Sequence, residues 1–121
     1  MMLAAILLAA AAPDPVAGTW EGTSLCQVKP SPCHDEHVIY RISRTGAGQY
    51  RLDGYKVVNR KELFMGSIDF TFDASRQQLH ADIVGARGSS TADLKLSAKH
   101  LSGNMTLTDG TLFRLIEVDK R

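Results

Sequence analysis

The feature that most constrains the fold of this chain is a two-residue alternation of apolar and polar side chains in short runs. The clearest run covers residues 63–73, in which Ile68, Phe70 and Phe72 are each preceded by a polar residue. Successive side chains of a β-strand point to opposite faces, so this run predicts a strand with one apolar and one polar face. Similar runs, separated by clusters of Gly, Asn, Asp and Ser, recur from Gly18 onwards and predict an all-β protein.

Eight such runs follow one another along the chain. They cover residues 18–25, 37–43, 49–58, 63–73, 79–83, 93–96, 101–107 and 111–119. Gly54, inside the third run, is expected to mark a β-bulge or a barrel corner, and Asp109-Gly110 is a dipeptide favoured in tight hairpin turns. The one candidate for a helix, 56–64, contains Val57, Val58 and Asn59, which lower its helix propensity.

Short strands joined by tight turns predict an antiparallel meander. Eight strands are about the smallest number that closes into a barrel whose interior is filled by side chains, and closure leaves no exposed sheet edge. We therefore expect an eight-stranded antiparallel up-and-down β-barrel. A two-sheet β-sandwich is the alternative, because alternation alone does not distinguish closure from the stacking of two sheets.

The first residues differ in kind from the rest of the chain. Residues 1–12 carry no charge and consist of Met, Leu, Ile and Ala, which is typical of the apolar part of a signal peptide. Pro13 and Asp14 end this run well short of the about 20 apolar residues that span a membrane. We expect residues 1–11 to be a cleaved signal peptide and 12–121 to form a single barrel domain; a buried N-terminal helix is the alternative.

Cys26 and Cys33 are the two cysteines of the chain. Export would bring them into an oxidising compartment, where two cysteines so close in sequence are expected to form a disulfide. A free thiol or a metal ligand is the competing interpretation. The leader and the cysteine pair together predict a periplasmic or secreted protein.

Charge is balanced along the chain, with 14 basic and 13 acidic residues and a formal net charge of +1. Such a chain has no sustained electric field that would attract nucleic acid or an anionic membrane. We therefore expect no binding of nucleic acid and no membrane insertion of the mature chain. The partners that remain are a small apolar ligand or an exported protein.

Two residues near the ends of the chain resemble a known superfamily. Gly18-Thr19-Trp20 opens the first strand and Arg114 lies within the last, a pattern that resembles the calycins, which include lipocalins, fatty-acid-binding proteins and avidins. In lipocalins a Gly-x-Trp tryptophan plugs one end of the barrel and an arginine from the last strand packs across its ring. The resemblance implies that Trp20 and Arg114 form a barrel-closing pair held by cation–π attraction.

The segments GTWEGTSLC, at 18–26, and SPCHDE, at 31–36, carry a second resemblance. They are similar to a group of small exported bacterial barrel proteins to which no function is assigned. The chain is much shorter than a true lipocalin and carries its cysteine pair in the first loop. Both departures argue against a large ligand cavity.

Large side chains are expected to occupy much of the barrel interior. The candidate ligand-lining residues are Tyr40, Tyr50, Phe70, Phe72 and Met105. A typical small-molecule pocket needs several hundred cubic ångströms, so we expect a ligand only at an open barrel mouth. A filled core is the alternative.

The segment 27–36 is the longest irregular stretch of the chain and our candidate contact loop for a partner. The residues proposed to make contact are Pro30, Pro32, His34, Asp35 and Glu36. The run 33–37 also contains every common type of metal-ligating side chain, but in an extended strand these would alternate in direction, and a disulfide would consume Cys33. We therefore expect no metal site.

Sequence motifs of known catalytic sites are not found. His80 and His100 lack a neighbouring nucleophile motif, and Gly85-Ala86-Arg87-Gly88 lacks the lysine and the helix of a phosphate-binding loop. We expect no enzyme and no cofactor. Three functions remain: a lipocalin-like module that binds a small apolar ligand at the barrel mouth, a protein-binding module such as an inhibitor of an exported hydrolase, and a structural envelope protein.

Reduction of the cysteine pair gives a first test. Closing a loop this short contributes about 2.5 kcal/mol in the chain-entropy model. Because 1 kcal/mol corresponds to roughly 4–8 °C in a domain of this size, we expect a reductant to lower the melting temperature by several degrees in a thermal-unfolding measurement. An unchanged transition would contradict a stabilising disulfide.

Overall fold

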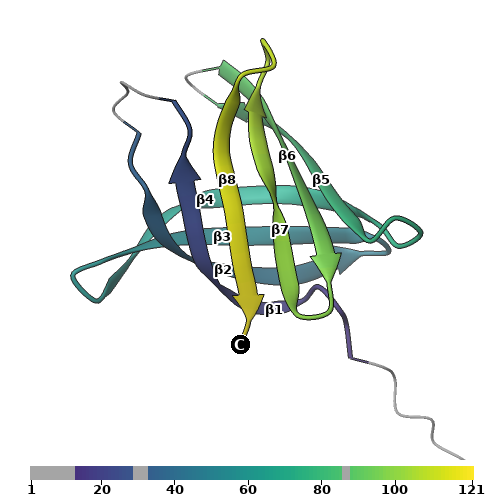
Figure 1. Ribbon diagram of the computed structural model, residues 1–121. Helices are drawn as coiled ribbons and strands as arrows, with labels where there is room; N and C mark the ends of the chain where they lie inside the picture. Colours follow the sequence, from purple (N-terminus) through teal and green to yellow (C-terminus); the bar gives the residue numbers. More distant parts are fainter. Residues whose placement is uncertain (1–12, 29–32, 86–87) are drawn as a thin grey trace, which may run out of the picture.

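The computed structural model describes residues 13–28, 33–85 and 88–121. Within them the chain forms a closed barrel of eight antiparallel strands, each paired with its neighbours in sequence, while the first strand pairs with the last (Figure 1). This confirms the predicted up-and-down barrel and excludes the two-sheet sandwich. The predicted signal peptide lies outside the described residues.

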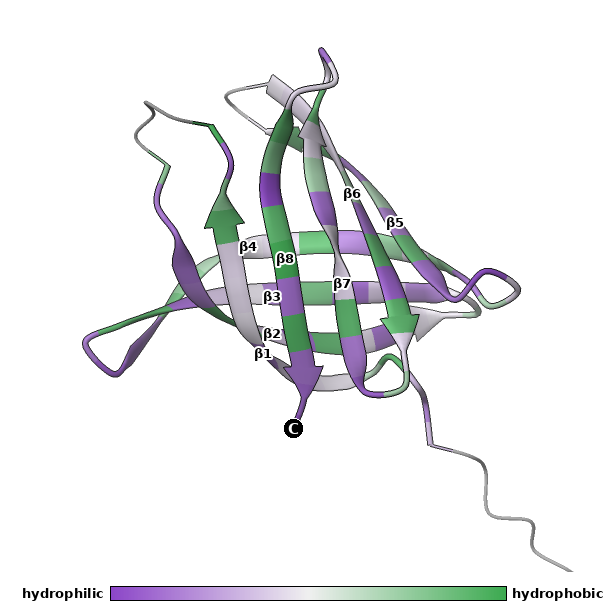
Figure 2. Ribbon diagram, in the orientation of Figure 1, coloured by the Kyte–Doolittle hydropathy of each residue, from purple (hydrophilic) through white to green (hydrophobic). Residues whose placement is uncertain are grey.

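The strands follow the predicted alternation closely. Their bounds are β1 (Gly18–Cys26), β2 (Glu36–Gly46), β3 (Gln49–Val58), β4 (Lys61–Asp73), β5 (Gln78–Gly85), β6 (Gly88–Ser97), β7 (His100–Leu107) and β8 (Leu112–Lys120). Along β8 apolar and polar bands follow one another, as Figure 2 shows by colour, and burial alternates over residues 115–119. The buried members of β8 are Ile116 and Val118, which belong to the hydrophobic core.

Two of the sequence signals for turns and bends are confirmed. The register between β3 and β4 shifts between Gly54 and Tyr55, where Met65 is the extra residue on β4, so Gly54 marks a bulge as predicted. At the turn between β7 and β8, Gly110 adopts a φ of 88° and its amide donates a hydrogen bond to the Leu107 carbonyl at 2.9 Å. A position with positive φ favours glycine, which explains why Asp109-Gly110 predicted the turn correctly.

Strand β4 begins two residues earlier than predicted. Asn59 and Arg60 both adopt left-handed conformations, with φ of 52° and 65°, and form the whole connection between β3 and β4. An arginine rarely takes a left-handed conformation, so the residues at this position did not predict a two-residue turn. The resulting long hairpin projects from the side of the barrel in Figure 1.

Closure depends on the pairing of β1 with β8. The register runs from Trp20 opposite Lys120 to Cys26 opposite Arg114, over seven residue pairs. Because the first and last strands pair, no edge is left at either end of the meander. The same register fixes which residues of β1 and β8 lie at each end of the barrel.

One end of the barrel is closed by the segment that precedes β1. Val16 and Trp20 are fully buried, and the indole Nε1 of Trp20 donates a hydrogen bond to the Val16 carbonyl at 2.9 Å. The Asp14 carboxylate accepts hydrogen bonds from the amides of Val16 and Ala17, at 2.8 and 2.9 Å, and from the Tyr50 hydroxyl at 2.9 Å. These contacts hold the segment across this end of the barrel, which we call the floor.

The predicted pairing of Trp20 with Arg114 is wrong. The cation over the Trp20 ring is Lys120, whose Nζ lies 5.7 Å from the ring centroid. Arg114 pairs six residues further along β1, opposite Cys26. At about 3.3 Å per residue this is roughly 20 Å away, toward the other end of the barrel. Lys120 takes the role at the floor that the resemblance assigned to an arginine.

The floor predicts a pH-dependent stability. Burial raises the pKa of Asp14, but the hydrogen bonds from Ala17, Val16 and Tyr50 and the nearby Arg44 charge outweigh it, so this pKa lies below its usual value. A carboxyl whose pKa is depressed by folding stabilises the fold above its unfolded pKa, and this contribution is lost as the pH falls through the folded pKa. Asp14→Asn should therefore cost about 1 kcal/mol at neutral pH and less as the pH falls through the folded pKa of the Asp14 carboxyl.

Urea unfolding of the wild type and the variant at several pH values measures this difference. Asp69→Asn is the matched control, because Asp69 forms only an exposed ion pair with Arg51, which contributes little. A stability loss of Asp14→Asn that is the same at pH 7 and pH 3 would contradict the assigned role of the carboxylate.

Candidate functional site

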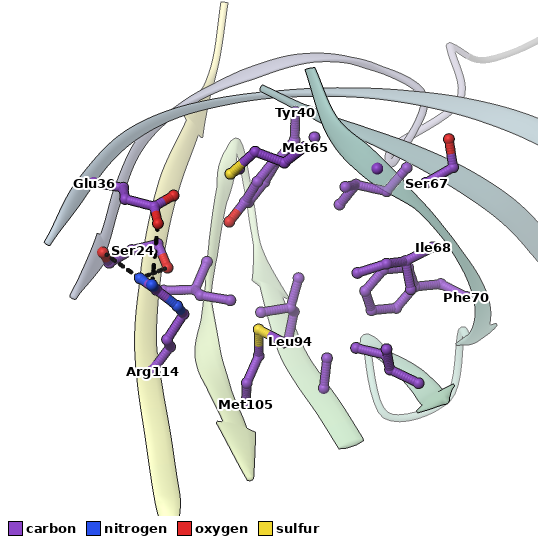
Figure 3. Close-up of a pocket in the computed structure, with 16 residues that line it drawn as sticks. Ser24, Glu36, Tyr40, Met65, Ser67, Ile68, Phe70, Leu94, Met105 and Arg114 are labelled. Carbon is purple, nitrogen blue, oxygen red and sulfur yellow. Dashed lines mark hydrogen bonds and ion pairs between the residues drawn. The ribbon is translucent and has the colours of Figure 1, made fainter. Parts of the chain in front are cut away.

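The barrel encloses a cavity of about 330 Å³ whose lining comes from all eight strands. Its wall is mainly apolar, as Figure 3 shows. The apolar side chains that line it are Leu52, Met65, Ile68, Phe70, Ile83, Ala92, Leu94, Met105 and Ile116. Because each strand contributes, the cavity lies inside the barrel and not between the barrel and a loop.

The cavity exists because small residues occupy inward positions at this end. Gly54 and Gly66 face each other in the β3–β4 register, and Ala92 of β6 also lines the cavity. At the floor, by contrast, the bulky Trp20 and Leu101 are fully buried and fill the interior. The barrel is therefore solid at one end and hollow at the other.

The wall of the barrel is incomplete between β4 and β5. These strands pair only over Thr71–Asp73 of β4, whereas residues 61–70, apart from the unpaired Met65, pair with β3 alone. Met65 of β4 and Ile83 of β5 line the cavity on the two sides of this interruption. Since Met65 is also exposed to solvent, the cavity reaches the surface here.

Exposed apolar side chains occur on both strands that border this side opening. Leu63, Phe64 and Met65 are consecutive on β4, and Phe64 is 60% exposed. Val84 follows Ile83 on β5 and is 86% exposed. Apolar residues gathered on the surface of a small protein commonly mark a place where a ligand or partner is bound.

One wall of the cavity is polar. The Nη2 of Arg114 forms an ion pair with the Glu36 Oε1 at 3.0 Å, and its Nη1 donates to the Ser24 Oγ at 3.1 Å (Figure 3). The same Nη1 donates to the backbone carbonyls of Ser24, at 3.2 Å, and His34, at 3.1 Å. The side chains of Arg114 and Glu36 are only 12% and 20% exposed, so this ion pair is largely shielded from water.

Tyr40 adds a hydroxyl group to the polar wall. Burial raises the pKa of Tyr40 to about 12; the Glu36 charge acts in the same direction, while a hydrogen bond with Ser24 and the Arg114 charge oppose the shift. The phenol therefore stays neutral at physiological pH. A neutral hydroxyl both donates and accepts hydrogen bonds.

A disulfide joins the first loop to the polar wall. Cys26 and Cys33 are bonded, with their Cα atoms 5.9 Å apart, which confirms the predicted pair. The Asp35 Oδ1 accepts a hydrogen bond from the Cys26 amide at 2.8 Å, and the neighbouring His34 carbonyl accepts from Arg114. The loop thus helps to hold the guanidinium in place. A disulfide is typical of proteins in an oxidising compartment.

The predicted ligand-lining residues divide into two groups. Tyr40, Phe70 and Met105 line the cavity. Tyr50 and Phe72 do not line it. Tyr50 is buried at the floor, where its hydroxyl donates a hydrogen bond to Asp14. Phe72 packs edge-on against the Tyr50 ring, with the ring centroids 6.2 Å apart. The alternation placed all five side chains inside the barrel, but it did not tell at which end each one lies.

Several residues of the predicted contact loop are tied to the barrel, while their contact with a partner stays a prediction. Pro30 and Pro32 lie outside the described residues. Asp35 and Glu36 are engaged by the Cys26 amide and by Arg114, and His34 contributes its carbonyl to the same network. In the described part, these contacts hold the loop against the barrel, while His34 and Asp35 remain exposed to solvent.

Sequence reasoning missed the polar wall, although a signal for it was present. Arg114 has the same parity as the core residues Ile116 and Val118, and Glu36 has the same parity as Val38 and Tyr40. Side chains of equal parity on a strand share one face. An arginine and a glutamate at inward-facing positions of two strands could therefore have been recognised as an internal ion pair.

The described histidine side chains lie outside the cavity lining. His80 contacts Asp93 at 2.6 Å and Asp82 at 3.1 Å, and His100 contacts Asp119 at 2.7 Å, all among exposed or half-exposed groups. Over residues 13–28, 33–85 and 88–121, no cluster of three or more His, Cys, Asp or Glu side chains could hold a metal ion.

Comparison with models of known protein families gave no match, and comparison with curated proteins gave none either. In the part of the chain that the structure describes, no helix has the length and apolar character needed to cross a membrane. The function therefore has to be inferred from the geometry and chemistry of the site itself.

The shielded ion pair predicts an asymmetric mutational result. Arg114→Met leaves the Glu36 charge unpaired in a largely buried place, which should cost about 3 kcal/mol. Replacing both residues, in Glu36→Met with Arg114→Met, removes the unpaired charge and should recover most of that loss. Urea unfolding of the two variants gives both values.

Arg41→Met serves as the control, because Arg41 forms an ion pair with Glu62 at the same 3.0 Å distance but on the exposed surface. Its expected cost is below about 1 kcal/mol. A double variant at positions 36 and 114 that is less stable than Arg114→Met would contradict the assignment.

Proposed function

We propose that this protein is an exported, calycin-like binding module that holds a small, mainly apolar ligand in the hollow end of its barrel. The observation that carries the proposal is the 330 Å³ cavity, to which all eight strands contribute and which reaches the surface between β4 and β5. An apolar cavity with a few convergent polar groups is the usual form of a small-molecule site. Arg114, Glu36, Ser24 and Tyr40 supply those polar groups.

The cavity volume limits the size of the ligand. Ligand pockets range from about 300 to 1,000 Å³, so this cavity is at the small end. A water molecule takes up about 30 Å³ in the liquid, so the volume corresponds to roughly eleven non-hydrogen atoms of that size. A compact ring with a short substituent meets this limit, whereas a long-chain fatty acid exceeds it.

Two features support a periplasmic or secreted location. The apolar leader at residues 1–11 has the composition of a signal peptide. The bond between Cys26 and Cys33 is of a kind that persists in oxidising compartments. Neither a nucleic acid nor a membrane is part of this proposal, because the charges of the chain are balanced.

A protein-binding module, such as an inhibitor of an exported hydrolase, is the second candidate. The observation that favours it is a pair of exposed leucines, Leu25 on β1 and Leu115 on β8, which are direct cross-strand neighbours. They lie beside the Cys26 end of the disulfide-bonded loop, so a partner could contact the leucines and the loop together. We find no observation in the described residues that favours a purely structural envelope role over these two candidates.

Blocking the cavity tests the ligand-binding function. Ile83 and Val84 are neighbours on β5, but Ile83 lines the cavity while Val84 is exposed on the outer face. Ile83→Trp places an indole ring in the cavity and should weaken the binding of 4-ethylphenol by at least about tenfold, as measured by isothermal titration calorimetry. Val84→Trp should bind the probe like the wild type.

Two results would count against this function. The first is that neither 4-ethylphenol nor ethylbenzene binds the wild type at any concentration up to the solubility limit of the probe. The second is that both tryptophan variants bind the probe with unchanged affinity, which would place the binding outside the barrel. Retention of one specific exported protein by the wild type, lost on changing Leu115 to Glu, would then favour the protein-binding candidate.

A further inference from the structure

The charges on the cavity wall already compensate one another. Among the described residues that line the cavity, Arg114 and Glu36 are the charged ones, and they are paired at 3.0 Å. Three further hydrogen bonds, to Ser24 and to the His34 carbonyl, hold the guanidinium in this position. The polar wall therefore presents oriented hydrogen-bonding groups without a net charge.

A charged ligand would disturb this balance. A carboxylate reaching Arg114 would have to displace Glu36, whose charge would then be left unpaired in a place that is only 20% exposed. An ammonium group reaching Glu36 would leave Arg114 in the same condition. Burying an unpaired charge is among the most unfavourable changes in a protein interior, so either ligand would lose affinity for this reason.

A neutral hydroxyl group meets no such cost. The phenol of Tyr40 is 7% exposed, lines the cavity and lies beside Ser24 on the polar side of the wall (Figure 3). Both residues carry hydroxyl groups, which are able to donate or accept. A ligand hydroxyl, amide or carbonyl could therefore form a hydrogen bond there without breaking the ion pair.

The apolar part of the cavity wall fits an aromatic ring. Figure 3 shows the sulfur-bearing side chains of Met65 and Met105 and the ring of Phe70 around the same space. Thioether sulfur atoms make favourable contacts with aromatic rings and adapt to their shape, and aromatic side chains pack well against a second ring. These contacts favour a flat ring over a flexible chain.

From these observations we infer that the cavity selects a small, uncharged aromatic molecule with one hydrogen-bonding group, such as a phenol, and discriminates against acids and amines of the same skeleton. The inference rests on the proposed ligand-binding function and specifies its ligand class. The polar group of the ligand lies against Tyr40 and Ser24, and its ring lies between the two methionines.

A matched series of probes tests the selectivity in the wild type. Ethylbenzene, 4-ethylphenol, 4-ethylbenzoate and 4-ethylbenzylammonium share one skeleton and differ mainly in the group at the ring position opposite the ethyl group. We expect 4-ethylphenol to bind about fivefold more tightly than ethylbenzene, because it gains one hydrogen bond. The two ions should bind at least about tenfold more weakly than 4-ethylphenol, as measured by calorimetry at neutral pH.

Glu36→Gln gives a second test, in which the preference is expected to reverse. Glutamine retains an oxygen that can accept from Arg114, but the guanidinium charge is no longer compensated. A ligand carboxylate then gains a charge-assisted hydrogen bond, so 4-ethylbenzoate should bind about tenfold more tightly than 4-ethylphenol. Glu62→Gln is the control, because Glu62 pairs with Arg41 on the exposed surface and should leave the wild-type order unchanged.

The outcomes separate this inference from the function on which it rests. If no probe binds, the ligand-binding function fails and the inference fails with it. If ethylbenzene binds and Ile83→Trp abolishes this binding, the function stands and the order of the four probes decides the inference. Wild-type preference for either ion, equal affinity for ethylbenzene and 4-ethylphenol, or an unchanged order in a folded Glu36→Gln protein would overturn it.

Discussion

The antiparallel pairing of β1 with β8 fixes the positions of the groups on which the rest of the structure depends. Its register places Trp20 beside Lys120 at one end and Cys26 beside Arg114 at the other. The first pair belongs to the floor of the barrel, and the second brings the disulfide-bonded loop to the polar wall of the cavity. A shift of one residue would turn every inward side chain of one strand outward, so the floor and the cavity depend on the same register.

The two ends of the barrel differ because their inward side chains differ in size. Trp20 and Leu101 fill the floor, and the segment around Asp14 covers it. At the other end Gly54, Gly66 and Ala92 leave space. Interiors of proteins are normally packed to high density, so a cavity of this volume forgoes packing energy that a filled barrel would gain. That unused packing is the physical reason to regard the hollow end as a site for a ligand.

The ion pair between Arg114 and Glu36 contributes more to the orientation of the hydrogen-bonding groups on the cavity wall than to the stability of the fold. Shielding two charges from water costs free energy that their attraction only partly returns, so a well-packed apolar pair could be as stable. The network around the pair does connect four parts of the fold, because Arg114 on β8 contacts Ser24 on β1, Glu36 on β2 and the His34 carbonyl in the loop. It thereby gives an otherwise apolar cavity one wall with fixed hydrogen-bonding directions.

The sequence by itself determined the strands, their number, the bulge at Gly54 and the cysteine pair, because alternation, turn residues and loop length are local properties. It also contained the inward parity of Arg114 and Glu36. Only the tertiary structure decided how far along the barrel axis each inward residue lies, since this depends on the register between strands distant in sequence. That register moved Arg114 from the floor to the cavity, placed Tyr50 and Phe72 at the floor, and let β4 and β5 diverge. Whether a residue has an odd or even position in its strand determines the face on which its side chain lies. Its depth along the barrel axis is determined by the register between paired strands.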